Sequence, residues 1–111
     1  MPVWTVSPIE DVPELRLRDW CVYESPDGDR HLVGYNITEM EGRVSSAVAT
    51  FDAKSQRAVT RSGRIYQLTG PSGHNADADY VWRQWKRIQG HGDYVDVTAQ
   101  VVEAIAAADG G

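Results

Sequence analysis

The sequence predicts an α+β domain in which five short strands are followed by two C-terminal helices. Apolar and polar residues alternate in several segments between residues 15 and 68, a pattern typical of half-buried strands. Glycine, proline and aspartate separate those segments at short intervals, as tight turns require. Beyond residue 77 the apolar residues recur with helical spacing. A chain of 111 residues is typical of one domain.

The first fourteen residues differ in composition from the rest of the chain. They contain Pro2, Pro8 and Pro13 together with three acidic residues. Proline fixes φ and lacks a backbone donor, so it interrupts both helices and central strands. We therefore expect residues 1–14 to form an extended N-terminal arm and residues 15–111 to form a single α+β domain.

The strands are expected at residues 15–24, 31–39, 44–52 and in two pieces within 57–68. Residues 25–30 and 39–43 read as turns and residues 52–56 as a loop. Ser62 and Gly63 are expected to turn the last hairpin, with Gly63 at positive φ. Tight turns favour an antiparallel meander. Such a meander would curl into a small open SH3-like barrel or have one face covered by a helix.

The two helices are predicted from their apolar stripes and their ends. The first is expected from residue 78 to 89, capped by Asp77 and ended by Gly90. The second is expected from residue 97 to 108, with Asp96 or Thr98 as its cap, and residues 90–94 as the hinge between the helices. The stripes consist of Ala78, Val81, Trp85 and Ile88, with Trp82 beside them, and of Val97, Val101, Ile105 and Ala108.

The cysteine content and the distribution of apolar residues indicate to which cellular compartment the protein belongs. Cys21 is the only cysteine, so the chain has no internal disulfide, and its apolar neighbours predict a buried thiol. The N-terminus lacks the pattern of a secretory signal, and no apolar run is long enough to span a bilayer. These features together predict a cytoplasmic bacterial protein.

Charge is distributed unevenly along the chain, whose net charge is −5. Residues 1–41 carry nine acids and three bases, whereas residues 42–64 carry one acid and five bases. The acidic total disfavours general nucleic-acid binding, but a local basic patch in the centre is compatible with it.

Motifs for catalysis and cofactor binding are absent from the sequence. The stretch GPSGHN lacks the lysine of a phosphate-binding loop, and no serine elbow or dinucleotide fingerprint occurs. His74 with Asp77 and Asp79 lacks the tighter spacing of zinc sites, and helix capping explains both aspartates. We therefore expect no cofactor, no metal and no enzymatic activity.

The candidate interaction residues lie on the basic hairpin, residues 57–68, and on the first helix. Arginine with an aromatic residue on a hairpin suits a protein interface or the binding of bases and phosphates. A third interpretation is a solvated hairpin that pairs with the acidic N-terminal third. The candidate residues are Arg57, Arg61, Arg64, Tyr66, Trp82, Arg83 and Arg87.

Several runs, including VTRSGRIYQLTGPSG and DADYVWRQW, resemble small uncharacterised proteobacterial proteins, some encoded near phage- or plasmid-derived genes. The resemblance covers about residues 18–96 and implies no activity. It suggests an accessory or host-defence-inhibiting role in a mobile element. The predicted function is a small non-enzymatic protein-interaction domain, with a protein partner or self-association, a homodimer included. The alternative is a small nucleic-acid-binding β-domain that uses the basic hairpin.

Overall fold

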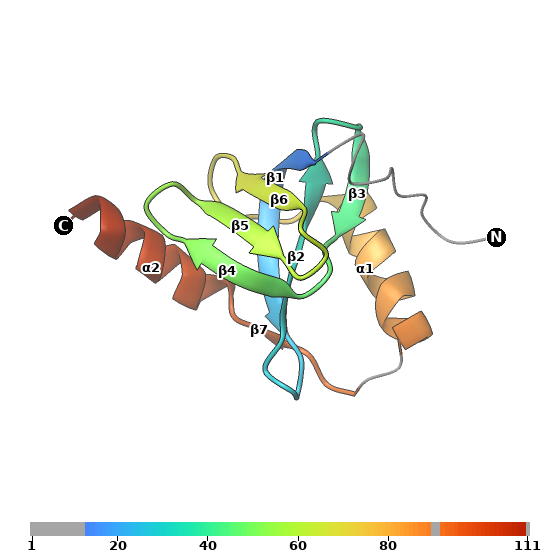
Figure 1. Ribbon diagram of the computed structural model, residues 1–111. Helices are drawn as coiled ribbons and strands as arrows, with labels where there is room; N and C mark the ends of the chain where they lie inside the picture. The colour runs from blue at the N-terminus through green and yellow to red at the C-terminus, as the bar shows by residue number, and fades with distance from the viewer. Residues whose placement is uncertain (1–12, 90–91, 111) are drawn as a thin grey trace.

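A computed structural model describes residues 13–89 and 92–110 and confirms the α+β class (Figure 1). The predicted arm at residues 1–12 lies outside the described residues, and Glu14 already belongs to the first strand. Two helices follow six strands, with a short seventh strand between the helices. The strands are β1 (Glu14–Glu24), β2 (Arg30–Asn36), β3 (Glu41–Val44), β4 (Val48–Asp52), β5 (Arg57–Thr60), β6 (Ile65–Leu68) and β7 (Val95–Asp96).

The sheet is mixed, so the prediction of a purely antiparallel five-stranded meander is wrong. Its order is β3-β2-β1-β6-β5-β4, and β7 pairs with the end of β1. The first half of β1 runs parallel to β6, with Leu15 opposite Tyr66 and Leu17 opposite Leu68. Parallel neighbours are joined by long connections, so their pairing leaves no turn signal in the local sequence.

The sheet curls strongly without closing. Strands β3 and β4 lie at opposite edges of the hydrogen-bonded order, although only residues 45–47 connect them. The backbone N–H of Arg61 donates to the carbonyl of Ala47 at 2.9 Å, and the hydroxyls of Ser46 and Ser62 lie 3.0 Å apart. No ladder joins β3 to β4 in the described part of the chain, so the sheet is open.

Two boundaries in this region differ from the prediction. The turn after β2 occupies residues 37–40 rather than 39–43, and Met40 adopts φ 57° there. The predicted strand at residues 44–52 is broken at residues 45–47. At the break, the Ser45 hydroxyl accepts the N–H of Leu32 at 2.8 Å and the Ser45 N–H donates to the Leu32 carbonyl. A serine can compete for backbone groups in this way, and the chain leaves β3 at this point.

A β-bulge in β1 keeps its apolar side chains on the same face. The register with β2 shifts between Arg18 and Cys21, and Asp19 adopts φ 48°. Leu15 and Leu17 precede the bulge, yet they share one core cluster with Trp20 and Val22, which follow it. Cys21 and Tyr23 belong to the other core cluster, where they pack with residues of α1, so β1 is apolar on both faces after the bulge.

Helix α1 (Ala76–Gln89) packs on the outer face of β2 and β3. Asn75, not Asp77, caps it, since Asn75 Oδ1 accepts the N–H groups of Asp77 and Ala78 at 2.9 and 3.1 Å. The helix therefore begins two residues before the predicted start. Ile88 is 59% exposed, so the predicted stripe does not extend to the last turn.

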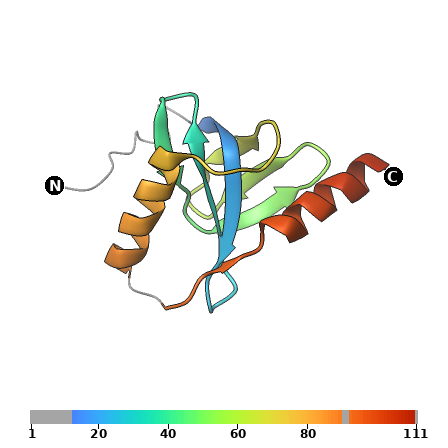
Figure 2. The same cartoon turned by 180° about the vertical axis from the view of Figure 1, so that it is seen from behind.

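Helix α2 (Thr98–Gly110) covers the inner face of the sheet, on the side opposite α1 (Figure 2). Val97 and Val101 are buried in the larger core cluster and Ile105 packs against it, as the predicted stripe requires. Thr98 Oγ1 accepts the N–H of Val22 at 2.9 Å, which fixes the helix start against β1. Residues 92–94 of the predicted hinge lead into β7, which the sequence did not predict; residues 90 and 91 lie outside the described residues.

Candidate functional site

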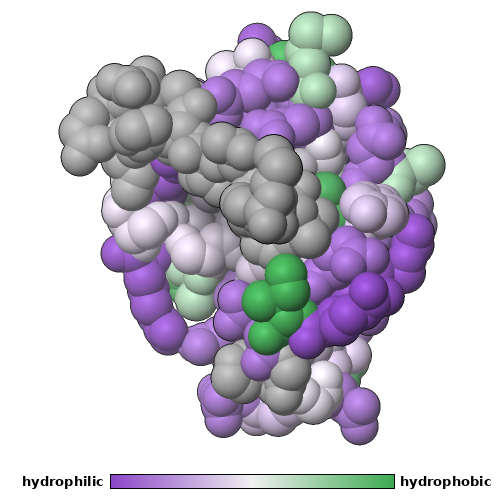
Figure 3. All heavy atoms as spheres, turned by 90° about the vertical axis from the view of Figure 1, so that its right-hand side faces the viewer, coloured by the Kyte–Doolittle hydropathy of each residue, from purple (hydrophilic) through white to green (hydrophobic). Residues whose placement is uncertain are grey.

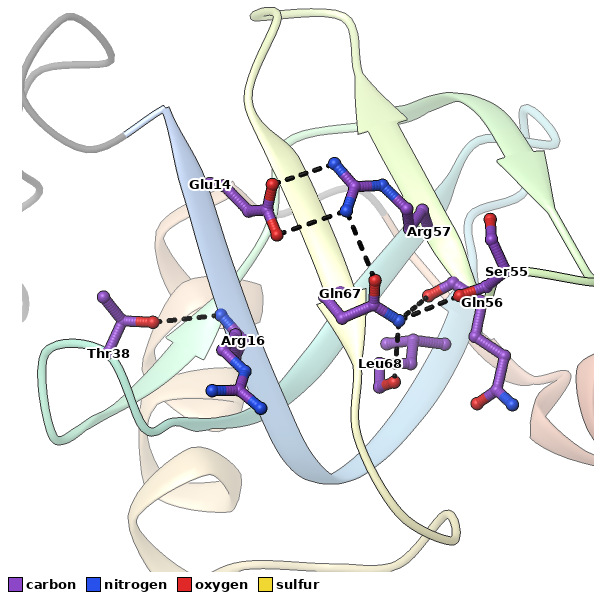
Figure 4. Close-up of polar contacts among 8 residues, drawn as sticks. All are labelled: Glu14, Arg16, Thr38, Ser55, Gln56, Arg57, Gln67 and Leu68. Atoms are coloured by element: carbon purple, nitrogen blue, oxygen red, sulfur yellow. Dashed lines mark hydrogen bonds and ion pairs between the residues drawn. The ribbon is translucent and has the colours of Figure 1, made fainter.

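The two outer arginines of the basic hairpin are held in ion pairs with the acidic N-terminal third. Arg57 forks onto Glu14, with Nη2 to Oε1 at 2.8 Å and Nη1 to Oε2 at 3.3 Å, and Nη1 also lies 3.5 Å from Gln67 Oε1 (Figure 4). Arg61 forks onto Asp29 at 2.6 and 3.2 Å. This pairing agrees with the ion pairing that the third interpretation expected, and the side chains of Arg57 and Arg61 remain 41% and 62% exposed.

The other two residues of the predicted patch lie inside the curled sheet. Arg64 is 3% exposed and Tyr66 is 2% exposed. The Tyr66 hydroxyl accepts a hydrogen bond from Arg43 Nε at 3.1 Å, and the Arg43 guanidinium carbon lies 5.9 Å from the Tyr66 ring centre. The prediction took both side chains to be available to a partner, whereas the structure buries them.

On α1, the predicted residues separate into a buried ring and an exposed basic row. The Trp82 ring stacks against Tyr23 at 4.5 Å and against Trp85 at 5.4 Å between ring centres. Arg83 and Arg87 are exposed. The side of the molecule drawn in Figure 3 is mainly hydrophilic where it is coloured. The role of the two arginines in an interaction stays a prediction.

The aromatic stack ends in a hollow of about 220 Å³ that no residue pattern predicted. Three inclined rings form its walls. His31 and Trp85 lie 4.7 Å apart at 54°, Trp85 and Tyr94 5.8 Å apart at 71°, and His31 and Tyr94 6.2 Å apart at 70°. We call this feature the aromatic hollow; its lining residues are Ser25, Asp27, Asp29, His31, Trp85, Gln89 and Tyr94.

Three segments distant in sequence bring these walls together. They are the start of β2 with the turn before it, the last turns of α1 and the stretch before β7; the turn and the stretch before β7 lie at the bottom of Figure 1. The turn is held by its own hydrogen bonds: Ser25 Oγ accepts the N–H of Asp29 at 3.1 Å, and Gly28 donates to the Ser25 carbonyl at 2.9 Å. These bonds fix Asp27 and Asp29 at the rim.

His31 contributes a buried ring with one nitrogen left to accept. It is 8% exposed, and its Nδ1 lies 2.9 Å from the carbonyl oxygen of Ser45. A carbonyl only accepts hydrogen bonds, so Nδ1 carries a proton and in the neutral ring Nε2 is the acceptor. Nε2 makes no hydrogen bond within the described ranges.

The rim is electrostatically negative. Burial raises the pKa of the Tyr94 hydroxyl, and the carboxylates of Asp27 and Asp29 raise it further because they disfavour the phenolate. Asp29 is paired with Arg61, whereas Asp27 is exposed and makes no ion pair with any residue that the structure describes. The same potential that opposes an anion at Tyr94 favours a cation beside it.

The sequence analysis missed this site because each of its residues has another explanation within its own segment of the sequence. Asp27 and Asp29 read as turn residues, His31 as one of three scattered histidines, and Tyr94 as part of a hinge. One feature of the sequence could have indicated the site: the segments next to the acidic turns are rich in Trp and Tyr. Only the fold brings those segments into contact.

Comparison with protein-family models, with curated proteins and with solved structures found no match. Within residues 13–89 and 92–110, no group of three His, Cys, Asp or Glu side chains is placed to hold a metal ion. His74 Nδ1 instead contacts Asp79 Oδ1 at 3.6 Å. No helix among these residues is both long and apolar enough to cross a membrane.

Proposed function

We propose that the protein is a small protein-interaction domain that receives a segment of a partner protein at the aromatic hollow. The observation that carries this proposal is the combination of three inclined aromatic walls with an acidic rim. Tyrosine and tryptophan supply much of the binding energy at protein interfaces, and concave sites concentrate it. An accessory role in a mobile element fits a domain of this kind and stays a prediction from the resemblance.

The charge arrangement favours a protein partner over a nucleic acid. Arg57 and Arg61 already bind carboxylates, and Arg64 is buried. Nucleic-acid affinity comes mainly from free cations that neutralise phosphates. The rim of the aromatic hollow carries Asp27 and Asp29 instead, and these repel phosphate groups.

Selection from a displayed library of random peptides tests the proposal. We expect selected peptides to perturb backbone amide NMR signals of residues 25–31, 85–89 and 92–94. Trp85→Ala should abolish the binding, and thermal unfolding would verify that this variant is folded. Tyr80→Ala is the matched control, because Tyr80 lies on the same helix, is 52% exposed and does not line the hollow.

Two results would contradict the proposal. One is a set of perturbations that maps away from the aromatic hollow. The other is oligonucleotide binding that weakens steeply with salt and is lost in Arg83→Ala and Arg87→Ala. Sedimentation of the original protein and of Trp85→Ala would show whether any self-association depends on the aromatic hollow.

A further inference from the structure

We propose that the aromatic hollow binds an alkylammonium group, the charged head of a lysine side chain or of its N-methylated forms. The inference rests on the proposed function and names the chemistry of the partner segment. The proposed function places an interface at the aromatic hollow, and this inference adds which chemical group the three rings and the acidic rim bind.

The ring geometry suits a rounded cation better than a flat group. The three ring pairs are inclined at 54°, 70° and 71°, so no two of the rings that line the hollow are parallel. A flat ring or a guanidinium would lie against one wall and leave the others without contact. A tetrahedral ammonium carries its alkyl substituents in several directions, so it can touch rings that are set at different angles.

The aromatic stack already holds one ammonium group, that of Lys86. The Lys86 Nζ atom lies 5.2 Å from the centre of the Trp82 ring, and Trp82 is stacked on Trp85. This distance lies within the range in which the ring quadrupole attracts a cation. Trp85 offers the same type of ring to the aromatic hollow.

The polar groups select for positive charge. Asp27 is exposed at the rim without an ion pair among the described residues, and Asp29 shares its carboxylate with Arg61. The acceptor nitrogen of His31 belongs to a ring that is more than nine-tenths buried. An ammonium that retains an N–H can donate to these acceptors, and its charge is attracted by Asp27, an attraction that a neutral side chain lacks.

Methylation should strengthen binding. A primary ammonium is strongly hydrated, and aromatic faces replace few of the hydrogen bonds that it loses. Each methyl group reduces that hydration and adds apolar contact while the positive charge stays. We therefore expect methylated lysine to bind more tightly than unmodified lysine, and acetylated lysine, which is neutral, not to bind measurably.

Titration of short peptides with one central lysine tests this inference by calorimetry and NMR. The arms are unmodified, dimethylated, trimethylated and acetylated lysine, a neutral tert-butyl isostere of trimethyllysine, and arginine. We expect trimethyllysine to bind about tenfold more tightly than its neutral isostere, because only the charge differs between them. Signals of Trp85, Tyr94 and His31 should move.

A charge-matched pair of variants identifies the source of the selectivity. Asp27→Asn should weaken methyllysine binding several-fold and leave the isostere unaffected. Asp109→Asn removes the same charge from the exposed end of α2, outside the aromatic hollow, and should change neither. Tetramethylammonium chloride at millimolar concentration should compete with the methyllysine peptides.

Equal affinity for the cation and its neutral isostere would overturn the inference, as would equally tight binding of the arginine peptide. The proposed function can fail separately. If no lysine peptide binds but library-selected peptides bind in a Trp85-dependent manner, only the alkylammonium assignment is wrong. If neither class of peptide binds, both are wrong.

Discussion

Burial controls the chemistry of Cys21. Its thiol is 2% exposed and packs in the smaller core cluster with Val33, Ala78 and Trp82. Burial raises its pKa to about 11, and this effect outweighs the opposing influence of the Tyr23 hydroxyl. The prediction of a buried thiol is thus confirmed, and the reactivity of the thiol can be measured.

We expect Cys21 to resist modification by an aromatic disulfide reagent at pH 8 in the folded protein. At that pH a pKa of about 11 leaves only about one thiol in a thousand ionised, whereas an unfolded cysteine is roughly a quarter ionised. Modification followed by absorbance should therefore accelerate by about a hundredfold or more in denaturing urea. Rapid modification without urea would show that the thiol is accessible in the native state.

Tyr66 has a structural role, because its hydroxyl accepts a hydrogen bond from the buried guanidinium of Arg43. Tyr66→Phe would leave Arg43 Nε without its acceptor, and Arg43 is 6% exposed. Loss of a hydrogen bond to a buried charged group costs about 1.5–3 kcal/mol, so the free energy of unfolding in urea should fall by that amount. Tyr35→Phe is the control, since Tyr35 is half-buried and only its ring contacts Arg18. A Tyr66→Phe protein as stable as the control would refute the structural role.

At the scale of elements, the contact between β3 and α1 depends on one glycine. A Cβ atom built on Gly42 would lie 2.5 Å from the carbonyl carbon and oxygen of Asp77 and 2.7 Å from the nitrogen of Ala78. These are backbone atoms of the first turn of α1, so only a shift of the helix or of the strand can relieve the clash. Helix α1 also carries Trp85, which makes the same contact relevant to the aromatic hollow.

We therefore expect Gly42→Ala to destabilise the fold by about 1–3 kcal/mol, the usual cost of overpacking. It should also weaken peptide binding at the aromatic hollow, because the new methyl group displaces α1 from its position against β3 and α1 carries Trp85. Gly73→Ala is the matched control: its new methyl group would meet Asp19 at ordinary contact distances of 3.5–3.8 Å. Thermal unfolding and peptide titration of both variants provide the measurement, and a Gly42→Ala protein that behaves like Gly73→Ala would disprove the role of this contact.

Local patterns predicted elements whose determinants lie within a few residues. The hairpin through Ser62 and Gly63 forms as expected, with Gly63 at φ 94°, and the stripe of α2 packs through Val97 and Val101. Elements that depend on distant partners were missed. The parallel pairing of β1 with β6, the short β7 and the break at Ser45 all arise from hydrogen bonds to segments far along the chain.

At the scale of the whole molecule, ion pairs between distant segments made the basic hairpin a weaker candidate site than the aromatic hollow. The uneven distribution of charge predicted either a basic binding face or an internal pairing of the two regions. Glu14 and Asp29, both in the acidic third, bind Arg57 and Arg61. The aromatic hollow could not be inferred from spacing, since His31, Trp85 and Tyr94 meet only after β2, α1 and the chain before β7 have packed.

We expect the two faces of the sheet to serve different purposes, the inner face stability and the outer face the proposed recognition. Helix α2 closes the inner core through Val97 and Val101, whereas α1 and the aromatic hollow lie on the outer face. Val101 also lines a small apolar cavity of about 30 Å³ beside Leu32 and Phe51. Loss of its methyl groups enlarges a space that is already incompletely filled.

Val101→Ala should therefore lower the free energy of unfolding by about 1–3 kcal/mol through lost burial and the larger cavity. The affinity for methyllysine peptides, measured well below the unfolding temperature, should stay within about twofold of the original value, because sites without shared contacts act additively. Trp85→Ala should show the opposite pattern, with peptide affinity affected more than stability. A Val101→Ala protein that loses affinity while still folded would show that the two faces are coupled, and the aromatic hollow would then depend on the packing of the whole molecule.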